Sequence, residues 1–361
     1  WNFAMPFDFP KAELHCHLDG CFRLSTCIEL ARERGVELPS YDVNELRSLV
    51  CKLQRTASLD EYLAHFMVTT PVFAGSREAI KRLTMEAIED KHQQGISYIE
   101  FRFCPHLLAD CDVTPRLNAK TAGTLTPRGV VEAVCTAAEE ARSRFPVVVR
   151  FILCALLDLP DWSMELAHMC KEFALRGVVA LDIAGAGIEA DSTFDDHKAA
   201  FDFCKEHSID ITVHAGEKGG PNQVHEAVHK LHATRIGHGY KTINDKAVYD
   251  DVIKKQIHLE VCPISSNLTA SVPEDMTAHP AISFLNDGVN FSLNTDNPGF
   301  HDADILHDYD VASRMFRFTE EQIKELNLNA LRSSFVEAPM KEKLIKDFKE
   351  AYYGNRNSTT L

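Results

Sequence analysis

The chain lacks the sequence features of membrane-spanning, nucleic-acid-binding and exported proteins. No uninterrupted apolar stretch of about 18 residues occurs, so no membrane-spanning helix is predicted. No run of Lys or Arg stands out, and a formal net charge of −15 disfavours binding to a phosphate backbone. The first residues, WNFAMPFDFPKAE, have no basic start followed by a long apolar segment. We therefore expect a soluble, cytoplasmic protein without a nucleic-acid partner or a membrane span.

The eleven cysteines also lack the close, regular spacing of a disulfide scaffold, and no C-x-x-C pair is present. Free thiols in a reducing compartment are the simplest interpretation. Cys104, Cys154 and Cys262 lie in strongly apolar stretches, where cysteine usually behaves as a small hydrophobic residue. We therefore expect no chemistry that depends on cysteine.

Short β-branched or aromatic runs alternate with longer amphipathic stretches along the chain. A length of 361 residues with 45% hydrophobic and 25% charged residues suits two average domains or one large α/β barrel. Eight such runs are found, at residues 11–18, 97–103, 147–156, 178–184, 210–215, 235–239, 257–262 and 289–295. The amphipathic stretches between them are typical of helices. Strand and helix repeated to eight predict a parallel (β/α)8 TIM barrel.

The gap between the first and second runs is much longer than the others. A predicted helix at 77–95 supplies the usual crossover, which leaves about residues 20–76 as an insertion after the first strand. Barrel enzymes keep their active sites on this face, so a helical lid is expected there. Predicted helices at 302–316 and 319–353 follow the last strand. We predict one barrel domain spanning 1–361.

Polar residues occur at the carboxyl ends of four predicted strands. His15 and His17 alternate in an extended segment, so their side chains share one face, as two ligands of one ion would. The other ends carry His214 (followed by Glu217), His238 and Asp296. Each histidine alone could be a buried core residue. A parallel barrel, however, gathers these ends into one ring, which predicts a common site.

Three imidazoles and a carboxylate form a nitrogen and oxygen ligand set that suits zinc or a similar divalent ion. A site for two ions bridged by a lysine would need that lysine at the end of a middle strand, and VVALDIAGAG has none. We therefore predict one Zn²⁺ per chain. Such an ion lowers the pKa of water toward neutrality and makes hydroxide available. Glu217, three residues after His214, is placed to exchange protons with the molecule under attack.

Two further motifs resemble other zinc sites. HEAVH, at residues 225–229, matches the His-Glu-x-x-His pattern of zinc proteases. It lies on the predicted helix between the fifth and sixth strands, which belongs to the outer ring of a barrel. HLE at 258–260, near Cys262 and Pro263, is similar to a cytidine-deaminase zinc motif but lacks Pro-Cys-x-x-Cys. Neither is expected to hold the ion.

The sequence closely resembles the adenosine deaminase family along nearly its whole length. The matching segments, in order, are PKAELHCHLDG, REAIKR, PHLLA, ALDIAG, TVHAGE, RIGHGY, CPISSNLT, SLNTDNP and NLNALRSSF. This resemblance implies a zinc-bound barrel that hydrolyses adenosine and 2′-deoxyadenosine to inosine products and ammonia. By position it implies that the metal is held by His15, His17, His214 and Asp296. Glu217 would protonate purine N1, and His238 would orient the water and help to remove its proton.

The resemblance also implies contacts with the rest of the substrate. Asp19 would meet the ribose hydroxyls and Gly185 a ring nitrogen of the purine. The apolar wall and lid would be formed by Leu59, Tyr62, Leu63, Phe66 and Leu156, of which the first four recur at helical spacing. A carboxylate at Asp19 accepts a hydroxyl hydrogen bond but repels phosphate. Related adenine and N6-methyl-AMP deaminases tend to have Glu and Asn at this position, so adenosine is favoured over a free base or a nucleotide.

Asn297 departs from the family pattern, which has a second aspartate, contacting purine N7, directly after the metal-binding one. An asparagine amide can donate to N7 at any pH but supplies no negative charge. We expect activity to survive at about one to two orders of magnitude below the level with Asp. Two alternatives remain open: deamination of a related purine, and an impaired relative that acts in binding or signalling. No oligomeric state is indicated, and a monomer fits the sequence.

Overall fold

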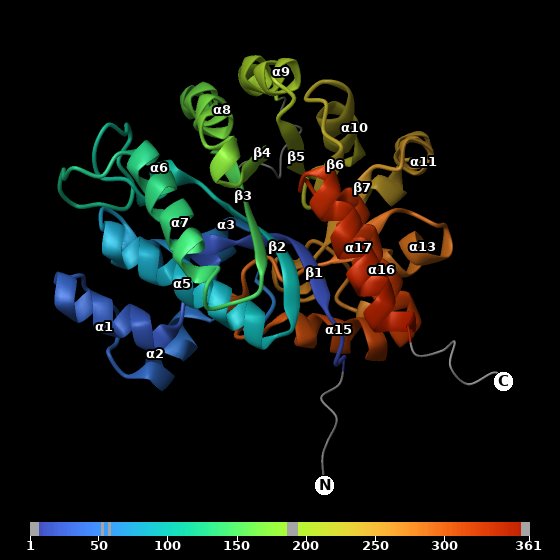
Figure 1. The fold of residues 1–361 in the computed structure, drawn as a ribbon, viewed down its shortest axis with the longest axis horizontal. Helices are drawn as coiled ribbons and strands as arrows, with labels where there is room; N and C mark the ends of the chain where they lie inside the picture. The colour runs from blue at the N-terminus through green and yellow to red at the C-terminus, as the bar shows by residue number, and fades with distance from the viewer. Residues whose placement is uncertain (1–6, 52–53, 57–58, 186–193, 355–361) are drawn as a thin grey trace, which may run out of the picture.

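Eight parallel strands form the centre of the molecule in the computed structural model, which describes residues 7–51, 54–56, 59–185 and 194–354 (Figure 1). Each strand pairs with the next in sequence order, and an isolated bridge between Cys16 and Asp296 joins the first strand to the segment after the last. The strands are β1 (Lys11–His17), β2 (Ile96–Phe103), β3 (Val148–Leu156), β4 (Val178–Ala184), β5 (Asp210–Ala215), β6 (Arg235–His238), β7 (His258–Val261) and β8 (Phe291–Leu293). All eight predicted strands are confirmed, with ends that differ by at most two residues.

The strands are buried on both faces, as parallel barrel strands are, which is why apolar residues dominate them with little alternation. Polar side chains that point into the barrel are paired with one another. Glu260 of β7 accepts hydrogen bonds from Arg102 of β2 and Arg235 of β6, at 2.6 and 2.7 Å. Buried charges are tolerated when they are paired in this way. An ionic layer therefore lies beneath the carboxyl ends of the strands.

Seven crossover helices surround the barrel, as the sequence predicts (Figure 1). They are α5 (Arg77–Gln93), α7 (Pro127–Ala141), α8 (Ser163–Glu172), α9 (Lys198–Glu206), α10 (Pro221–His229), α11 (Lys246–Lys255) and α13 (Pro280–Asn286). Several begin at a residue whose side chain accepts from a free amide of the first turn. Ser76 caps α5, Thr126 caps α7 and Asp245 caps α11.

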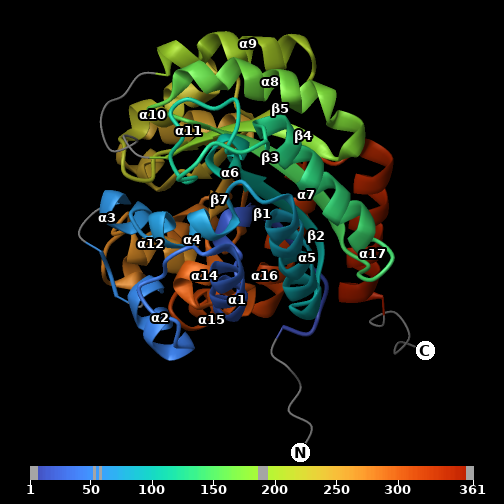
Figure 2. The ribbon, with the colours of Figure 1, turned by 90° about the vertical axis from the view of Figure 1, so that its left-hand side faces the viewer.

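The insertion after β1 is helical and lies against the carboxyl ends of the strands (Figure 2). It contains α1 (Leu24–Arg34), α2 (Val43–Val50), α3 (Leu59–Leu63) and α4 (Phe66–Phe73). Residues 52–53 and 57–58 of the predicted lid are outside the described residues. The amide of Thr56 donates to the carbonyl of Leu268 at 2.8 Å, and the Phe66 ring lies 4.3 Å from the Phe300 ring, centroid to centroid. The insertion is thus packed onto segments that follow β7 and β8.

Three short helices on the carboxyl side of strands were not predicted: α6 (Pro105–Leu108) after β2, α12 (Pro263–Leu268) after β7, and α14 (Pro298–His301) after β8 and Asp296. Six 3-10 helices accompany them: η1 (Leu18–Gly20), η2 (Pro160–Trp162), η3 (Ala174–Arg176), η4 (Asp195–His197), η5 (Tyr240–Asn244) and η6 (Met276–Ala278). The chain ends in α15 (Ile305–Arg314), α16 (Glu320–Ser333) and α17 (Ala338–Tyr353). Leu331 of α16 and Phe348 of α17 pack with Leu14 and Tyr98 in a second apolar cluster.

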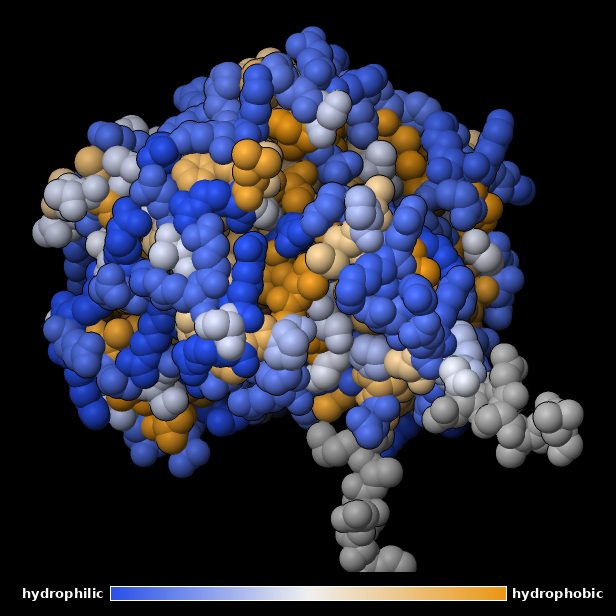
Figure 3. Space-filling model, viewed as in Figure 1, coloured by the Kyte–Doolittle hydropathy of each residue, from blue (hydrophilic) through white to orange (hydrophobic). Residues whose placement is uncertain are grey.

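The surface seen in Figure 3 is largely hydrophilic, with a hydrophobic strip near the middle of that face. Within the described part of the chain, no helix is long and apolar enough to cross a membrane. All eleven cysteines are free, and Cys111 alone among them is not fully buried. The expectation of free thiols is therefore confirmed.

Candidate active site

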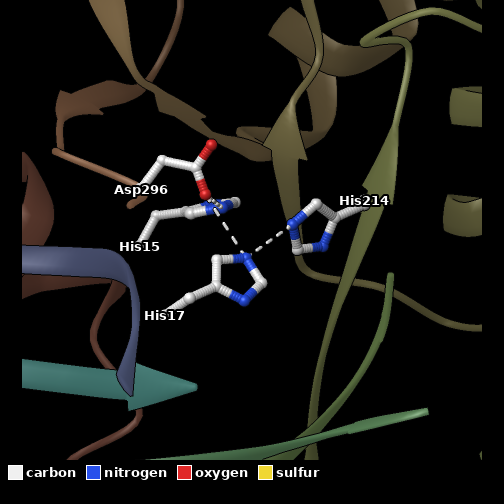
Figure 4. Close-up of side chains that lie close together, drawn as sticks. All are labelled: His15, His17, His214 and Asp296. Carbon is white, nitrogen blue, oxygen red and sulfur yellow. Dashed lines mark hydrogen bonds and ion pairs between the residues drawn. The ribbon is translucent and has the colours of Figure 1, made fainter. Parts of the chain in front are cut away.

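Four side chains converge at the carboxyl ends of β1, β5 and β8 (Figure 4). One ligand atom from each of His15, His17, His214 and Asp296 lies within 4.8 Å of every other. Nε2 of His17 is 3.3 Å from Nε2 of His214, and Oδ1 of Asp296 is 3.3 Å from Nε2 of both His15 and His17. Ligands about 2.0–2.1 Å from a tetrahedral zinc ion lie about 3.3–3.4 Å apart. The donor set and its spacing therefore fit one divalent ion such as zinc.

Two carboxylates orient the imidazoles of His15 and His214 through hydrogen bonds to Nδ1. Nδ1 of His15 lies 2.8 Å from Oε2 of Glu260, and Nδ1 of His214 lies 3.1 Å from Oδ1 of Asp182. Burial alone would raise the pKa of Glu260, but Arg102 and Arg235 hold it well below its usual value. A charged carboxylate accepts, so each Nδ1 carries the hydrogen and each Nε2 keeps a lone pair that faces the other ligands.

The backbone brings Asp296 to this point by closing the barrel. Its amide donates to the carbonyl of His15 at 3.0 Å, and its carbonyl accepts from the amide of His17 at 2.7 Å. The residue has a φ of 65°, a left-handed conformation that costs about 1–2 kcal/mol for a residue with a side chain. Such strain is found most often at functional sites. Ser265 Oγ donates to Asp296 Oδ2 at 2.6 Å and so fixes the carboxylate.

A glycine makes room for the imidazoles. A Cβ on Gly237 of β6 would lie 3.1 Å from Cε1 of His15 and 3.2 Å from the His214 ring. Contacts this short would force the rings to shift, so the RIGHG segment needs glycine between its isoleucine and histidine.

Glu217 follows β5 and is 3% exposed. The hydroxyls of Thr269 and Ser271 each lie 3.1 Å from its Oε1, in position to donate, while Oε2 lies 3.7 Å from Nε2 of His238. Burial, together with the nearby charge of Asp296, raises the pKa of Glu217. Its Oε2 is therefore the oxygen suited to hold and transfer a proton.

His238 has a defined tautomer. The hydroxyl of Tyr240 donates to the carbonyl of Cys262 at 3.2 Å, so toward Nδ1 of His238, at 3.4 Å, it can only accept. Nδ1 of His238 therefore carries the hydrogen, and Nε2 has the free lone pair. Burial lowers the pKa of His238 well below its usual value, so the ring is neutral and able to accept a proton.

A cavity of about 270 Å³ opens above these groups, beneath the insertion. Every residue predicted from the sequence to contact the substrate lines it: Asp19, Leu59, Tyr62, Leu63, Phe66, Leu156, Gly185 and Asn297. His17, His214, Glu217, His238 and Asp296 lie on the same lining, and His15 lies behind them. Of the described residues that line the cavity, none is Lys or Arg. A mainly apolar wall thus surrounds a polar floor, and the described lining has no Lys or Arg to pair with a phosphate.

The sugar and purine contacts implied by the sequence have suitable surroundings. Asp19 is 5% exposed, and burial raises its pKa to about 6. Within the described chain its Oδ1 has no hydrogen-bond partner, which leaves an acceptor for a ligand hydroxyl. Gly185 directly follows β4 with a φ of 103°, and a Cβ there would come within 3.3 Å of Leu156.

The sequence did not reveal the residues that support the site. Asp182 and Glu260 orient the imidazoles, and Ser265, Thr269 and Ser271 bind the carboxylates of Asp296 and Glu217. A charged residue inside an apolar strand, as in VVALDIA and IHLEV, was the available signal, because a buried charge needs a partner. His225 and His229 of HEAVH are exposed on α10 and do not line the cavity, which agrees with their exclusion.

Comparison with known proteins agrees with this geometry. The family model "Adenosine deaminase" matches residues 10–351. The chain is 42% identical to an adenosine deaminase from Danio rerio over 360 residues, covering 100% of both chains. It is 41% identical to one from Mus musculus, covering 96% of this chain and 98% of that protein. A solved amidohydrolase from Burkholderia ambifaria with bound Zn superposes with a TM-score of 0.82 at 21% identity, covering 96% and 92% of the two chains. The chain therefore belongs to the adenosine deaminase family.

Proposed function

We propose that the protein catalyses the hydrolytic deamination of adenosine and 2′-deoxyadenosine to inosine and 2′-deoxyinosine, with release of ammonia. The observation that carries this proposal is the convergence of four metal-ligand side chains at the floor of a cavity whose wall holds Glu217 and His238. Relatives named adenosine deaminase, at 41–42% identity over almost the whole chain, support the same substrate.

The two titratable residues divide the proton transfers between them. Attack at C6 of adenine breaks the conjugation of the ring and places charge on N1. Glu217, whose pKa is raised, can hold a proton and deliver it to N1. Neutral His238 can accept the proton of the attacking water through Nε2. Proton transfer by positioned side chains is typically worth about 10²–10⁴-fold in rate.

Zn²⁺ is the proposed cofactor, with one ion per chain held by His15, His17, His214 and Asp296. When bound, it would lower the pKa of a water molecule so that hydroxide is available near neutral pH. The support for zinc is a donor set of three nitrogens and one oxygen, in which the measured distances between neighbouring ligand atoms are 3.3 Å. The zinc-containing structural neighbour provides an analogy in the same fold.

The cavity lining favours a nucleoside over a nucleotide. Asp19 can accept from a ribose hydroxyl through its unpartnered Oδ1, and at neutral pH its charge would repel a phosphate. The described lining has no Lys or Arg that could pair with a phosphate, which also favours a nucleoside. We assign Gly185 to a purine ring nitrogen and Asn297 to N7. Leu59, Tyr62, Leu63, Phe66 and Leu156 would enclose the base and exclude bulk water.

We further infer that the chain is a single catalytic domain in which the insertion at about 20–76 acts as the lid. Two contacts support this assignment: the Phe66 ring packs on the Phe300 ring, and the Thr56 amide donates to the Leu268 carbonyl. Both join the insertion to segments that follow the barrel strands and so place it over the cavity. A lid of this kind keeps the reaction away from solvent.

The test is an assay of ammonia release from adenosine, 2′-deoxyadenosine, adenine and AMP, with and without a zinc chelator. We expect turnover of the two nucleosides, little with adenine or AMP, and loss of activity on chelation that returns with added Zn²⁺. Full turnover after complete metal removal would contradict the proposal. A protein that binds metal and nucleoside but releases no ammonia would instead be a binding relative.

A further inference from the structure

A buried polar pair lies at the wall of the cavity: Tyr62 belongs to the lining, and its hydrogen-bond partner His301 does not. Tyr62 of α3, in the insertion, and His301 of α14 are 1% and 4% exposed. Tyr62 Oη lies 2.7 Å from Nε2 of His301. The rings of Phe66 and Phe300 stand beside them. The proton transfers described above use neither residue, although burying two polar groups in such surroundings requires that they be paired.

The direction of this hydrogen bond follows from the other partner of His301. Hydrogen bonding to the backbone of Thr295 opposes the fall in the pKa of His301 that burial causes, so the group involved is the carbonyl, which can only accept. Burial lowers the pKa of His301 to about 4, so the ring is neutral and has one N–H. That N–H serves the carbonyl, and Nε2 faces Tyr62 with its lone pair. The Tyr62 hydroxyl therefore donates to His301, and its oxygen keeps lone pairs for a donor.

The donor is the side-chain amide of Asn297, which lines the same cavity as Tyr62 and whose hydrogen bonding opposes the rise in the pKa of Tyr62 that burial causes. The other end of that amide lies against η1: a Cβ on Gly20 would come within 2.4 Å of Asn297 Oδ1. Among the described residues, this Oδ1 has no hydrogen-bond partner. Gly20 thus accommodates the carbonyl end and Tyr62 holds the amino end. Because Asn297 lines the cavity, the second N–H of its amide is available to a ligand.

We propose that Tyr62 and His301 are positioning residues that fix the amide of Asn297 with its nitrogen toward the ligand, so that Asn297 donates to N7 of the purine. A carboxyl group has two equivalent oxygens, whereas an amide has one donor end and one acceptor end. An asparagine that recognises an acceptor such as N7 therefore needs a neighbour that selects its orientation. The chain from the Thr295 carbonyl through His301 and Tyr62 to Asn297 supplies one. This inference rests on the proposed function of the site.

The experiment compares two adenosine analogues. 7-Deazaadenosine lacks N7, and 1-deazaadenosine keeps N7 but lacks the N1 that must be protonated. Dissociation constants of both are measured by calorimetry on the zinc-loaded wild type, Tyr62→Phe and Asn297→Ala. In the wild type, the contact with N7 should make the dissociation constant of 7-deazaadenosine larger than that of 1-deazaadenosine. In Tyr62→Phe we expect the ratio of these two constants to fall about fivefold or more, because the Asn297 amide would no longer be directed at N7. Asn297→Ala should give the same loss, and adding Tyr62→Phe to it should change the ratio no further.

Tyr249→Phe is the matched control, because Tyr249 lies on α11 and its hydroxyl bonds to Asp287 at 2.9 Å, outside the cavity lining. In Tyr249→Phe, the ratio of the two dissociation constants should equal that of the wild type. An unchanged ratio in Tyr62→Phe, or an equal loss of affinity for both analogues, would show that the pair only fastens the insertion and would overturn the proposal. Failure of both analogues to bind the wild type would overturn the proposed function as well. Turnover of adenosine combined with an unchanged ratio would overturn the positioning role alone.

Discussion

In the proposed reaction, Glu217 is the residue that delivers the proton to purine N1. Glu217→Gln keeps the size of the side chain and one oxygen for Thr269 and Ser271, but an amide cannot release a proton to N1. We expect the turnover number for adenosine to fall by at least about 100-fold, with zinc content and the unfolding transition unchanged. Ammonia release and atomic absorption measure the two effects. Turnover close to wild type would mean that the proton comes from another group.

At Asn297 the groups around the amide set the expected change. Asn297→Asp introduces the residue of the family pattern, but an ionised carboxylate has no hydrogen to donate to N7 and would face the lone pairs of the Tyr62 oxygen. We therefore expect the turnover number to fall about 10- to 100-fold, in contrast to the gain that the family pattern alone suggests. Asn286→Asp, at the exposed end of α13, is the control and should have no effect. An increase in Asn297→Asp would mean that the site is not adapted to the amide.

Single residues were predictable where the pattern and the barrel agree. His15, His17, His214 and Asp296 each lie within three residues of the carboxyl end of a strand, and topology alone brings strand ends together. Asp182 and Glu260 were not predicted, because their role depends on which side chain lies opposite them inside the barrel. His301 was missed for the same reason: its partner, Tyr62, is distant in sequence, and no local pattern links the two.

At the scale of elements, α10 allows a test of the protease motif. His225 and His229 are exposed on its outer face, and His229 Nε2 lies 2.8 Å from Oδ2 of Asp251 on α11. Replacing either histidine with Ala should leave the zinc content and the turnover number unchanged, since neither residue lines the cavity. Metal analysis after dialysis provides the measurement, with His214→Ala as the variant that should lose the ion. Loss of zinc in His225→Ala or His229→Ala would support the protease interpretation.

The crossover helices were predicted well, whereas the short helices that follow strands were not. The crossover helices have at least two turns of amphipathic pattern, so their periodicity is visible in the sequence. The helices α6, α12 and α14 have four to six residues, too few for a period to appear. Each begins with proline directly after a strand or its polar end. Proline at the first position of a helix was the available signal.

For the whole molecule, buried neutral histidines predict sensitivity to acid. Burial lowers the pKa of His279 to about 3, whereas an unfolded chain has a value near 6.5. Below about pH 6.5 the unfolded state binds a proton that the folded state does not. The free energy of unfolding should therefore decrease as the pH falls toward 3, by up to about 1.4 kcal/mol per pH unit. In His279→Gln, which cannot titrate there, the decrease should be less steep.

Urea unfolding at about pH 7, 6 and 5 measures this difference in slope. His258, whose pKa burial lowers to about 4, is present in both proteins and contributes equally to each. Gln can still pair with the Ser266 hydroxyl that lies 3.0 Å from Nε2 of His279. Parallel pH profiles for the two proteins would show that His279 does not contribute to the acid sensitivity.

The two halves of the cavity are built on different parts of the fold. The histidines proposed to hold the metal and the carboxylates behind them belong to β1, β4, β5 and β7. Much of the proposed purine wall belongs instead to α3, α4 and Asn297, which directly precedes α14. Hydrolysis and recognition can therefore diverge separately in evolution. Substitutions in the insertion can change which amino compound enters while the ionic layer and the ligand set stay intact. A designer who seeks a deaminase for another heterocycle has the same division to use, with the barrel retained and the lid replaced.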